Sequence, residues 1–221
     1  MILDGTKGAI IQRGFRTYGI SPHLPCGTVT PDMLRKIADV ADKYGATLKC
    51  TSAQRIVILG IKEQDIDEAW KALGGERPGH LFGNVVRSVR ACPGTEFCKR
   101  ARQDSLSLGL ELDRLYHGKS LPGKMKIGVS GCPNQCSETA VKDIGLIGGV
   151  RGWSIVVGGA CGTNPRLAKE LTETEVSRET ALDIVAQLIA FFQKNARPDE
   201  RLGDLIARVG MDALRQAVRA A

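Results

Sequence analysis

The segments Cys92-Pro93-Gly94-Thr95-Glu96-Phe97-Cys98 and Cys132-Pro133-Asn134-Gln135-Cys136 contain four cysteines in two tightly spaced pairs. Five residues separate the first pair and three separate the second. Four thiolates on two short loops can bind an iron–sulfur cluster. A zinc ribbon would use two C-x₂-C knuckles, and a bacterial ferredoxin would bring three closely spaced cysteines in one run. The spacing therefore favours a cluster of another type.

The residues around these cysteines also indicate loops that wrap around a bound group. Pro93 and Pro133 follow the first cysteine of each pair, and a proline ends regular structure and removes a backbone donor. Gly94 and Gly131 permit positive φ or a close backbone approach. Disulfides of a small secreted protein, or simple core thiols, are the alternatives, but they leave these prolines and glycines without a role.

The bulk composition is that of a soluble globular protein with one large domain or two small ones. Of 221 residues, 43% are hydrophobic and 25% are charged, and no apolar run is long enough to span a bilayer. The N-terminus, MILDGTKGAI, lacks the pattern of a secretory signal. With seven cysteines, an odd number, we expect a cytoplasmic protein in a reducing compartment. The three cysteines outside the pairs are expected to be buried: Cys26, Cys50 and Cys161.

The net charge of +7 points to an anionic ligand rather than to nucleic acid. Aromatic residues make up only 5% of the chain, and no RNP, zinc-finger or helix-turn-helix pattern is present. We therefore expect no nucleic-acid partner. Scattered, solvated charge remains the alternative explanation for most of these side chains.

The first third of the chain predicts a β-α-β-β-α unit with a ferredoxin-like order. Thr30-Pro31 is a strong helix start, and Gly45 ends that helix. The predicted strands are Lys7–Arg13, Ala46–Thr51 and Arg55–Ile61. A second helix covers Ile66–Leu73, Ser21–Gly27 is a loop, and residues 74–79 form a linker.

The remainder predicts an α/β unit, so the expected domains are residues 1–75 and 80–221. Strands are expected to lead into both cysteine loops, at Asn84–Ala91 and Lys124–Ser130. Two further strands are expected at Val141–Ile147 and Trp153–Val157. The expected helices are Lys99–Tyr116, Thr180–Asn195 and Asp199–Ala221.

CPGTEFC followed by GCPNQC resembles the cluster-binding signature of the sirohaem sulfite and nitrite reductases, and residues 27–61 resemble their ferredoxin-like half-domain. The resemblance implies an α+β protein, with that half-domain followed by an α/β iron–sulfur/sirohaem-binding domain. It also implies that Cys92, Cys98, Cys132 and Cys136 bind a [4Fe–4S] cluster, and that Cys136 additionally bridges to the sirohaem iron. The resemblance covers nearly the whole chain, and it implies a small sulfite reductase of the low-molecular-weight assimilatory type.

Lys124 and Lys126 are the candidate catalytic cations. Residues two apart on a strand face the same way, so their ammonium groups can hold an oxyanion, and mutual repulsion lowers one pKa. They match a K-x-K pair of the family, although lysines on a solvated strand edge would look the same. Arg87 resembles an active-site arginine of the family, with Arg90 as the neighbouring alternative.

Several polar residues near the motifs are candidate contacts to the cofactor. The family usually reads T-x-R-Q after the second strand of the half-domain, where this chain reads Thr51-Ser52-Ala53-Gln54-Arg55. Gln54 and the shifted Arg55 are therefore assigned to the sirohaem carboxylates. Lys99 and Arg100 follow the first cysteine loop and Asn134 lies within the second, so all three are further candidates, with surface roles as the alternative.

The expected activity is the six-electron reduction of sulfite to sulfide. Neither a Rossmann fingerprint nor a flavin signature is present, so electrons must come from an external donor, a ferredoxin-like protein or a partner reductase. Reduction of nitrite to ammonia is one alternative, and a non-catalytic iron–sulfur electron-transfer protein is another. Large members of the family contain both domains twice. The single copy here favours a homodimer in which the lysines of one chain face the sirohaem of the other, against a monomer that uses its own lysines.

Overall fold

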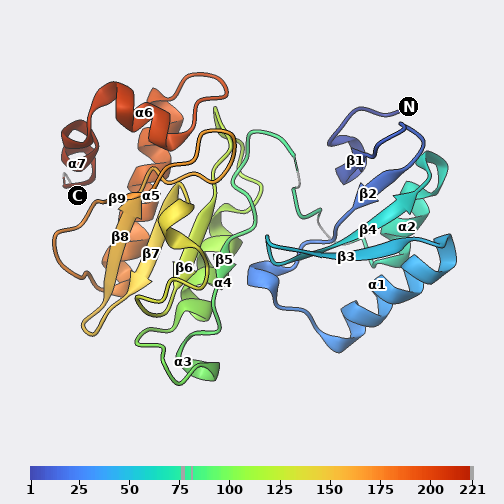
Figure 1. Cartoon of the computed structure of the whole chain (residues 1–221), viewed down its shortest axis with the longest axis horizontal. Coiled ribbons are helices and arrows are strands. Elements are labelled where there is room, and N and C mark those ends of the chain that lie inside the picture. Colours follow the sequence, from blue (N-terminus) through green and yellow to red (C-terminus); the bar gives the residue numbers. More distant parts are fainter. Residues whose placement is uncertain (76–77, 81, 220–221) are drawn as a thin grey trace. The chain divides into compact units, whose positions relative to one another are not determined.

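The computed structural model describes residues 1–75, 78–80 and 82–219, which form two compact units, Met1–Gly83 and Asn84–Ala221 (Figure 1). Positions 76 and 77 of the predicted linker lie outside the described residues, as do the last two positions of the predicted helix Asp199–Ala221. No helix in the described part of the chain combines the length and the apolar character needed to cross a lipid bilayer.

The first unit is an antiparallel sheet with two helices. Its strand order is β1-β2-β4-β3, with β1 at Ala9–Ile11, β2 at Tyr18–Ile20, β3 at Thr47–Thr51 and β4 at Arg55–Ile61. The helices are α1 (Pro31–Tyr44) and α2 (Ile66–Ala72). Three short 3₁₀ turns complete the unit: η1 (Thr6–Gly8), η2 (Pro25–Gly27) and η3 (Glu63–Asp65).

Local signals define α1 at both ends, as predicted. The Thr30 side chain accepts a hydrogen bond from the Met33 amide, which satisfies one of the first free donors of the helix. Gly45 has a φ of 58° and returns its amide to the Ala41 carbonyl. Only glycine adopts this left-handed conformation without a steric cost, so the helix ends there.

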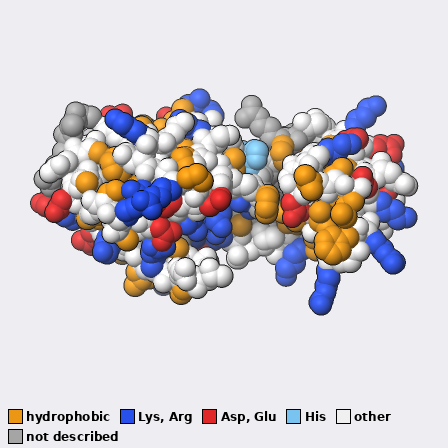
Figure 2. Space-filling model, turned by 90° about the horizontal axis from the view of Figure 1, so that it is seen from above, with side chains coloured by type: hydrophobic (Ala, Val, Ile, Leu, Met, Phe, Trp, Pro, Cys, Tyr) orange, Lys and Arg blue, Asp and Glu red, His pale blue; other side chains and the backbone are white. Residues whose placement is uncertain are grey.

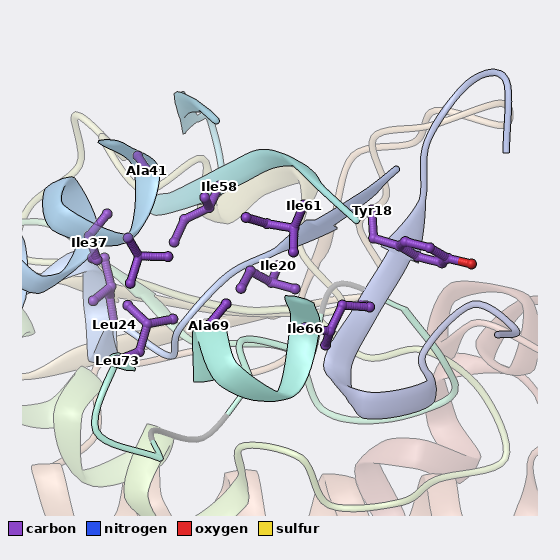
Figure 3. Close-up of a cluster of buried hydrophobic side chains, with 12 residues drawn as sticks. Tyr18, Ile20, Leu24, Ile37, Ala41, Ile58, Ile61, Ile66, Ala69 and Leu73 are labelled. Atoms are coloured by element: carbon purple, nitrogen blue, oxygen red, sulfur yellow. The ribbon is translucent and has the colours of Figure 1, made fainter. Parts of the chain in front are cut away.

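Both helices pack over one hydrophobic core (Figure 3). Ile20 and Ile58 come from neighbouring strands, Ile37 comes from α1 and Ile66 from α2, and all four are fully buried. The other buried members are Ala9, Tyr18, Leu24, Val40, Ala41, Ile61, Ala69 and Leu73. The core therefore uses alternate residues of β2, Tyr18 and Ile20, and residues at helical spacing on α1, whereas β4 contributes Ile58 and Ile61, which are three residues apart.

The second unit is a five-stranded mixed sheet in the order β5-β6-β7-β8-β9. Its strands are β5 (Arg90–Ala91), β6 (Ile127–Ser130), β7 (Ile144–Gly148), β8 (Trp153–Val157) and β9 (Lys169–Glu170). The pairs β5–β6 and β6–β7 are parallel, whereas β7–β8 and β8–β9 are antiparallel. The parallel half of the sheet is the part that leads into the cysteine loops.

Two helices pack against this sheet. The helix α4 (Ser105–Tyr116) packs against β5 and β6, and α5 (Arg178–Asn195) packs against β8. The last two helices, α6 (Leu202–Val209) and α7 (Met211–Arg219), pack on α5. Two short pieces lie in the cysteine loops: α3 (Gly94–Phe97) and the 3₁₀ turn η4 (Thr139–Val141).

Several predicted elements have other bounds in the structure. The predicted helix Lys99–Tyr116 begins only at Ser105, because the Asp104 side chain accepts the Ser107 amide and caps it. The predicted strand Asn84–Ala91 is reduced to β5 and isolated bridges. The predicted strand Lys124–Ser130 begins at Ile127. The C-terminal helix is split at Gly210, whose φ is 90°.

The short elements β2, α3 and β9 were not predicted. Each has two to four residues, too few to display a hydrophobic period. Cys26 is buried as predicted, but the prediction was wrong for Cys50 and Cys161, which are exposed. Cys50 lies on β3, which ends the strand order of its sheet, and Cys161 follows β8 in a loop, so neither position has a core to enter.

The surface charge is dispersed on the face that Figure 2 presents. Lys and Arg side chains lie on both units there, with acidic and hydrophobic side chains between them (Figure 2). That face therefore carries no continuous basic stripe of the kind that nucleic-acid-binding proteins use.

The core of the first unit provides a matched test of this fold. Ile58 on β4 is fully buried, whereas Leu48, its partner across the β3–β4 ladder, is 38% exposed. We expect Ile58→Ala to lower the free energy of unfolding by about 2–5 kcal/mol, because it leaves a cavity. Leu48→Ala should cost less than half as much. Urea unfolding of the full chain measures both, and equal losses would contradict the assigned core.

Candidate functional site

The two cysteine loops leave neighbouring parallel strands at the same end. Ala91 of β5 pairs with Val129 of β6, and Cys92 follows directly while Cys132 follows two residues after Ser130. The Cys92 amide donates a hydrogen bond of 3.1 Å to the Val129 carbonyl. Because parallel strands present their carboxyl ends at one edge of a sheet, the pairing brings both loops together.

Hydrogen bonds tie the two loops to each other. The Gly131 amide donates to the Cys92 sulfur at 3.1 Å, and the Gly131 carbonyl accepts from the Arg102 amide at 2.7 Å and the Gln103 amide at 3.1 Å. The Ser105 hydroxyl donates to the Cys92 carbonyl and lies 3.0 Å from the Cys92 sulfur. An amide aimed at a cysteine sulfur stabilises a thiolate, the form that binds iron.

Two glycines are required by the packing between these loops. A Cβ on Gly131 would lie 2.7 Å from the Gln103 carbonyl oxygen. Gly94 has a φ of 70°, and a Cβ there would lie 2.9 Å from the Ser105 amide nitrogen. Gly131 therefore lets the second loop approach the backbone at Gln103, and Gly94 lets the first loop approach the start of α4.

The cysteines form a set of free thiols suited to a cluster. The four motif cysteines are not in disulfides in the structure, which agrees with a role as cluster ligands rather than with the disulfide alternative. Cys92 and Cys132 are each 8% exposed, Cys98 is half-buried and Cys136 is exposed. Two inner and two outer thiols on loops that are tied together fit the four-cysteine donor set of a [4Fe–4S] cluster.

Ion pairs anchor the second loop. Glu138, two residues after Cys136, accepts hydrogen bonds from Arg90 at 2.5 Å and from the Lys142 ammonium at 2.9 Å. The Lys142 side chain is only 3% exposed. Glu138 and Gln135 both have positive φ, at 56° and 50°. These contacts hold the loop in a tight turn, and Asn134 lies exposed within it.

Lys124 and Lys126 share one face of an extended segment, as predicted. Met125 between them is fully buried, while both lysines are partly exposed. The Met125 amide donates to the Val85 carbonyl at 3.2 Å, and its carbonyl accepts from the Arg87 amide at 2.9 Å. A parallel bridge to the segment that contains Arg87, rather than a continuous strand, therefore fixes the lysine pair.

A buried ion pair lies directly behind Lys126. Asp143 is fully buried and receives two hydrogen bonds from Arg201, Nε to Oδ1 at 3.0 Å and Nη2 to Oδ2 at 2.7 Å. Asp143 Oδ2 also accepts the backbone amide of Lys126 at 2.7 Å. One carboxylate therefore holds both the backbone of Lys126 and the guanidinium of Arg201.

These side chains form a dense set of positive charges, here called the cation group: Arg87, Arg90, Lys124, Lys126, Lys142 and Arg201. Burial, then Arg201 and Arg87, lowers the pKa of Lys124. Burial, then Lys124 and Arg201, lowers the pKa of Lys126. In the described part of the chain, Arg90 and Lys142 share Glu138 and Arg201 pairs with Asp143, so positive charge exceeds negative charge among these pairs and the group favours an anionic ligand.

The lysine pair and the second cysteine loop lie at opposite ends of β6. Five residue steps separate Lys126 from Gly131, which is about 16 Å of extended chain. The cation group extends from Lys124 and Lys126, where the strand enters the sheet, to Arg90 and Lys142, which bind Glu138 just after the second cysteine pair.

The other predicted contacts lie outside the cation group. Gln54, with a φ of 55°, and Arg55 are at the β3–β4 turn of the first unit. Lys99 and Arg100 are exposed in the segment before α4. Their roles toward a cofactor remain predictions.

Sequence reasoning missed Glu138, Lys142, Asp143 and Arg201 as members of the site. Glu138 and Lys142 could have been noticed as an acid–base pair four residues apart beside a cysteine motif. Asp143 and Arg201 are 58 residues apart and carry no local signal, so only the fold reveals their pairing.

Two family models match the chain. Residues 10–75 match the nitrite/sulfite reductase ferredoxin-like half domain, and residues 82–221 match the nitrite and sulphite reductase 4Fe-4S domain. Together they cover both units that the structure describes.

Individual relatives agree with these models. An assimilatory-type sulfite reductase of Nitratidesulfovibrio vulgaris is 38% identical over 216 residues, which cover 97% of this chain and 98% of that protein. A nitrite reductase [NAD(P)H] of Bacillus subtilis is 36% identical over 88% of this chain, but the match spans only 24% of that protein. Of these two relatives, the sulfite reductase is the one that the match spans over nearly its whole length.

Solved structures share the fold. Dissimilatory sulfite reductase I superposes with a TM-score of 0.82 over 94% of this chain and 70% of that chain, at 16% identity. The NirA protein of Mycobacterium tuberculosis gives a TM-score of 0.81 over 96% of this chain and 44% of that chain, at 20% identity. With both family models, a full-length relative and this fold in agreement, the chain belongs to the nitrite and sulphite reductase family, whose members carry a [4Fe–4S] cluster and sirohaem.

Proposed function

We propose that this protein is a sulfite reductase that converts sulfite to sulfide with six electrons from an external donor protein. The main support is the match at 38% identity to a sulfite reductase over 98% of that protein's length. Nitrite is the competing substrate, since relatives at 33–36% identity are nitrite reductases. Assays with both anions and reduced viologen decide between them, and a higher kcat/KM for nitrite would overturn the assignment.

The four cysteines Cys92, Cys98, Cys132 and Cys136 would hold the cluster, with Cys136 as the bridge to sirohaem. These cofactors would relay the electrons of the external donor and would supply the iron that binds the substrate. The chain itself supplies the protein environment: the Gly131 amide stabilises the Cys92 thiolate, and the Glu138 ion pairs keep the Cys136 loop in place.

Lys124, Lys126 and Arg87 would bind the oxyanion, and the two lysines would deliver protons. A lowered pKa makes each ammonium a better proton donor at neutral pH than an ordinary lysine. Arg87 keeps its charge throughout and so orients the anion without losing a proton. Such a clamp has no use in a pure electron carrier, which is the reason to favour an enzyme over that alternative.

Further residues are assigned to the sirohaem carboxylates: Gln54, Arg55, Lys99, Arg100 and Asn134. Three of them, Lys99, Arg100 and Asn134, are exposed beside the cysteine loops, where a polycarboxylate could approach. A cytoplasmic location is proposed because an odd number of cysteines, seven, suits a reducing compartment.

We further propose a homodimer in which the lysine pair of one chain serves the sirohaem of the other. Its support is that the chain carries one set of motif cysteines and one lysine pair, and that closed two-fold pairing is the commonest form of homo-oligomer. The alternative is a monomer whose C-terminal helices cover the surface that a second copy would occupy.

Replacing Cys136 tests the bridging assignment. Cys136→Ser should lose cluster iron and the electronic coupling between cluster and sirohaem, because the shared thiolate is gone. Iron analysis and the visible spectrum measure both effects. Cys161→Ser is the matched control, since Cys161 is also exposed but lies outside both motifs. A Cys136 variant with a normal, coupled spectrum would disprove the assignment.

Charge removal tests the lysines. Lys124→Met and Lys126→Met should each reduce kcat roughly 10²–10³-fold with normal cofactor content, the usual cost of removing one donor from a developing anion. In the unmodified enzyme, the rate should fall at high pH earlier than the pKa of a free lysine would require, because both ammonium groups lose their protons early. Unchanged rates in both variants would contradict the clamp.

Co-expression of two inactive variants tests the dimer. In a mixed dimer of Cys136→Ser and Lys126→Met chains, one site would combine intact cysteines with the intact lysine of the other chain. Activity should therefore return when the chains are co-expressed, and sedimentation should give a dimer mass. A monomer mass with full activity, or no recovery, would mean that the lysines act within their own chain.

A further inference from the structure

The C-terminal segment before α6 contacts the segment that carries the lysine pair. The Asp199 amide donates to the Pro122 carbonyl at 2.9 Å. Asn84 donates to that same carbonyl at 3.2 Å and to the Asp199 side chain at 2.6 Å. A Cβ on Gly123 would lie 1.9 Å from the Glu200 carbonyl oxygen, so the two backbones are in close contact. The turn at 197–201 is therefore built onto the chain that leads into Lys124.

This turn directs Arg201 into the cation group. The Arg201 side chain is 18% exposed, and its Nε and Nη2 are both bound by the buried Asp143. In the described part of the chain, Nη1 has no hydrogen bond. A guanidinium that is fixed by one edge and partly open at the other is oriented to bind an anion.

The position of Asp143 links Arg201 to the lysines. The carboxylate that holds Arg201 also accepts the Lys126 amide, and the Asp143 backbone carbonyl accepts the Gly158 amide at 2.8 Å. Burying this carboxylate is costly unless it is fully hydrogen-bonded. Any displacement of Arg201 would therefore leave Asp143 poorly compensated beside the backbone of Lys126.

We infer that Arg201 is a further anion-binding residue of this site, and that Asp143 is the positioning residue that aligns Arg201 with Lys126. The ligand is an oxyanion of the size of sulfite or nitrite, and only this identification rests on the proposed function. The C-terminal segment is then a part of the substrate site and not only a cover for the sheet.

Arg201 and Asp143 shift the pKa of Lys124 in opposite directions. Arg201 lowers the pKa of Lys124 and of Lys126, whereas Asp143 raises the pKa of Lys124. Arg87 also faces Lys124, and Arg90 and Lys142 also face Lys126. Removing Arg201 should therefore keep the lysines protonated to higher pH, and neutralising Asp143 should deprotonate Lys124 at lower pH.

The experiment measures sulfate affinity by calorimetry on the cofactor-loaded protein, from neutral to alkaline pH. Sulfate keeps its charge over this range and is not consumed, so the result does not depend on turnover. Arg201→Met should weaken binding about tenfold or more, the cost of losing one charged hydrogen-bond donor. Its remaining affinity should decline at a higher pH than in the unmodified protein. Asp143→Asn should also weaken binding, but with a decline at lower pH.

Two further variants separate this role from simple folding. Arg208→Met breaks the pair that Arg208 forms with Glu200 in the same turn, at 2.8–2.9 Å, and should leave sulfate affinity and its pH dependence unchanged. Arg201→Lys keeps the positive charge but loses the guanidinium geometry. Its sulfate affinity should therefore be lower, but it should decline over the same pH range as in the unmodified protein. Sulfate binding can be measured even if the protein does not reduce sulfite. A failure to reduce sulfite would refute the proposed function but not the role of Arg201 in anion binding.

The inference is overturned by unchanged sulfate affinity in Arg201→Met, or by declines of Arg201→Met and Asp143→Asn that move in the same direction. Loss of sirohaem with normal sulfate affinity would instead assign Arg201 to the cofactor carboxylates, and this also overturns it. A steady-state comparison with sulfite gives an independent check, since loss of a substrate contact raises KM or lowers kcat without changing cofactor content.

Discussion

The parallel pairing of β5 with β6 is the constraint on which the site depends. It brings two cysteine loops, 40 residues apart in sequence, to one edge of a sheet, where the Gly131 amide reaches the Cys92 sulfur. The same strand β6 begins beside Lys126. A shift in the pairing of β6 would therefore move the thiols and the lysine pair together.

The cation group has an electrostatic cost that the rest of the second unit offsets. Burial and repulsion from neighbouring cations lower the pKa values of Lys124 and Lys126. The folded protein therefore destabilises the charged form of each lysine relative to a lysine in water. Asp143 and Glu138 compensate part of this charge through well-formed ion pairs. The remaining positive charge is available to an anion, so binding relieves repulsion that folding created.

Much of the fold was predictable because its signals are local. The Thr30 cap, Pro31 and Gly45 define α1, and the apolar run Arg55–Ile61 gave β4 with its observed bounds. Elements of two to four residues, such as α3, were missed because they are shorter than any period. The start of α4 was placed too early, because the side-chain bond of Asp104 to the Ser107 amide outweighs the helical character of the residues before it.

For the site, the sequence alone determined the four cysteines with their spacing, and the alternation that puts Lys124 and Lys126 on one face of Met125. Backbone geometry at short range is sufficient for both features. Only the tertiary structure decided that Arg201 would meet Asp143 behind Lys126, and that Arg90 and Lys142 would meet at Glu138. Such contacts depend on strand register and on the path of a distant turn. They are ion pairs between buried or partly buried side chains that are distant in sequence, and no local sequence pattern predicts which charges will meet.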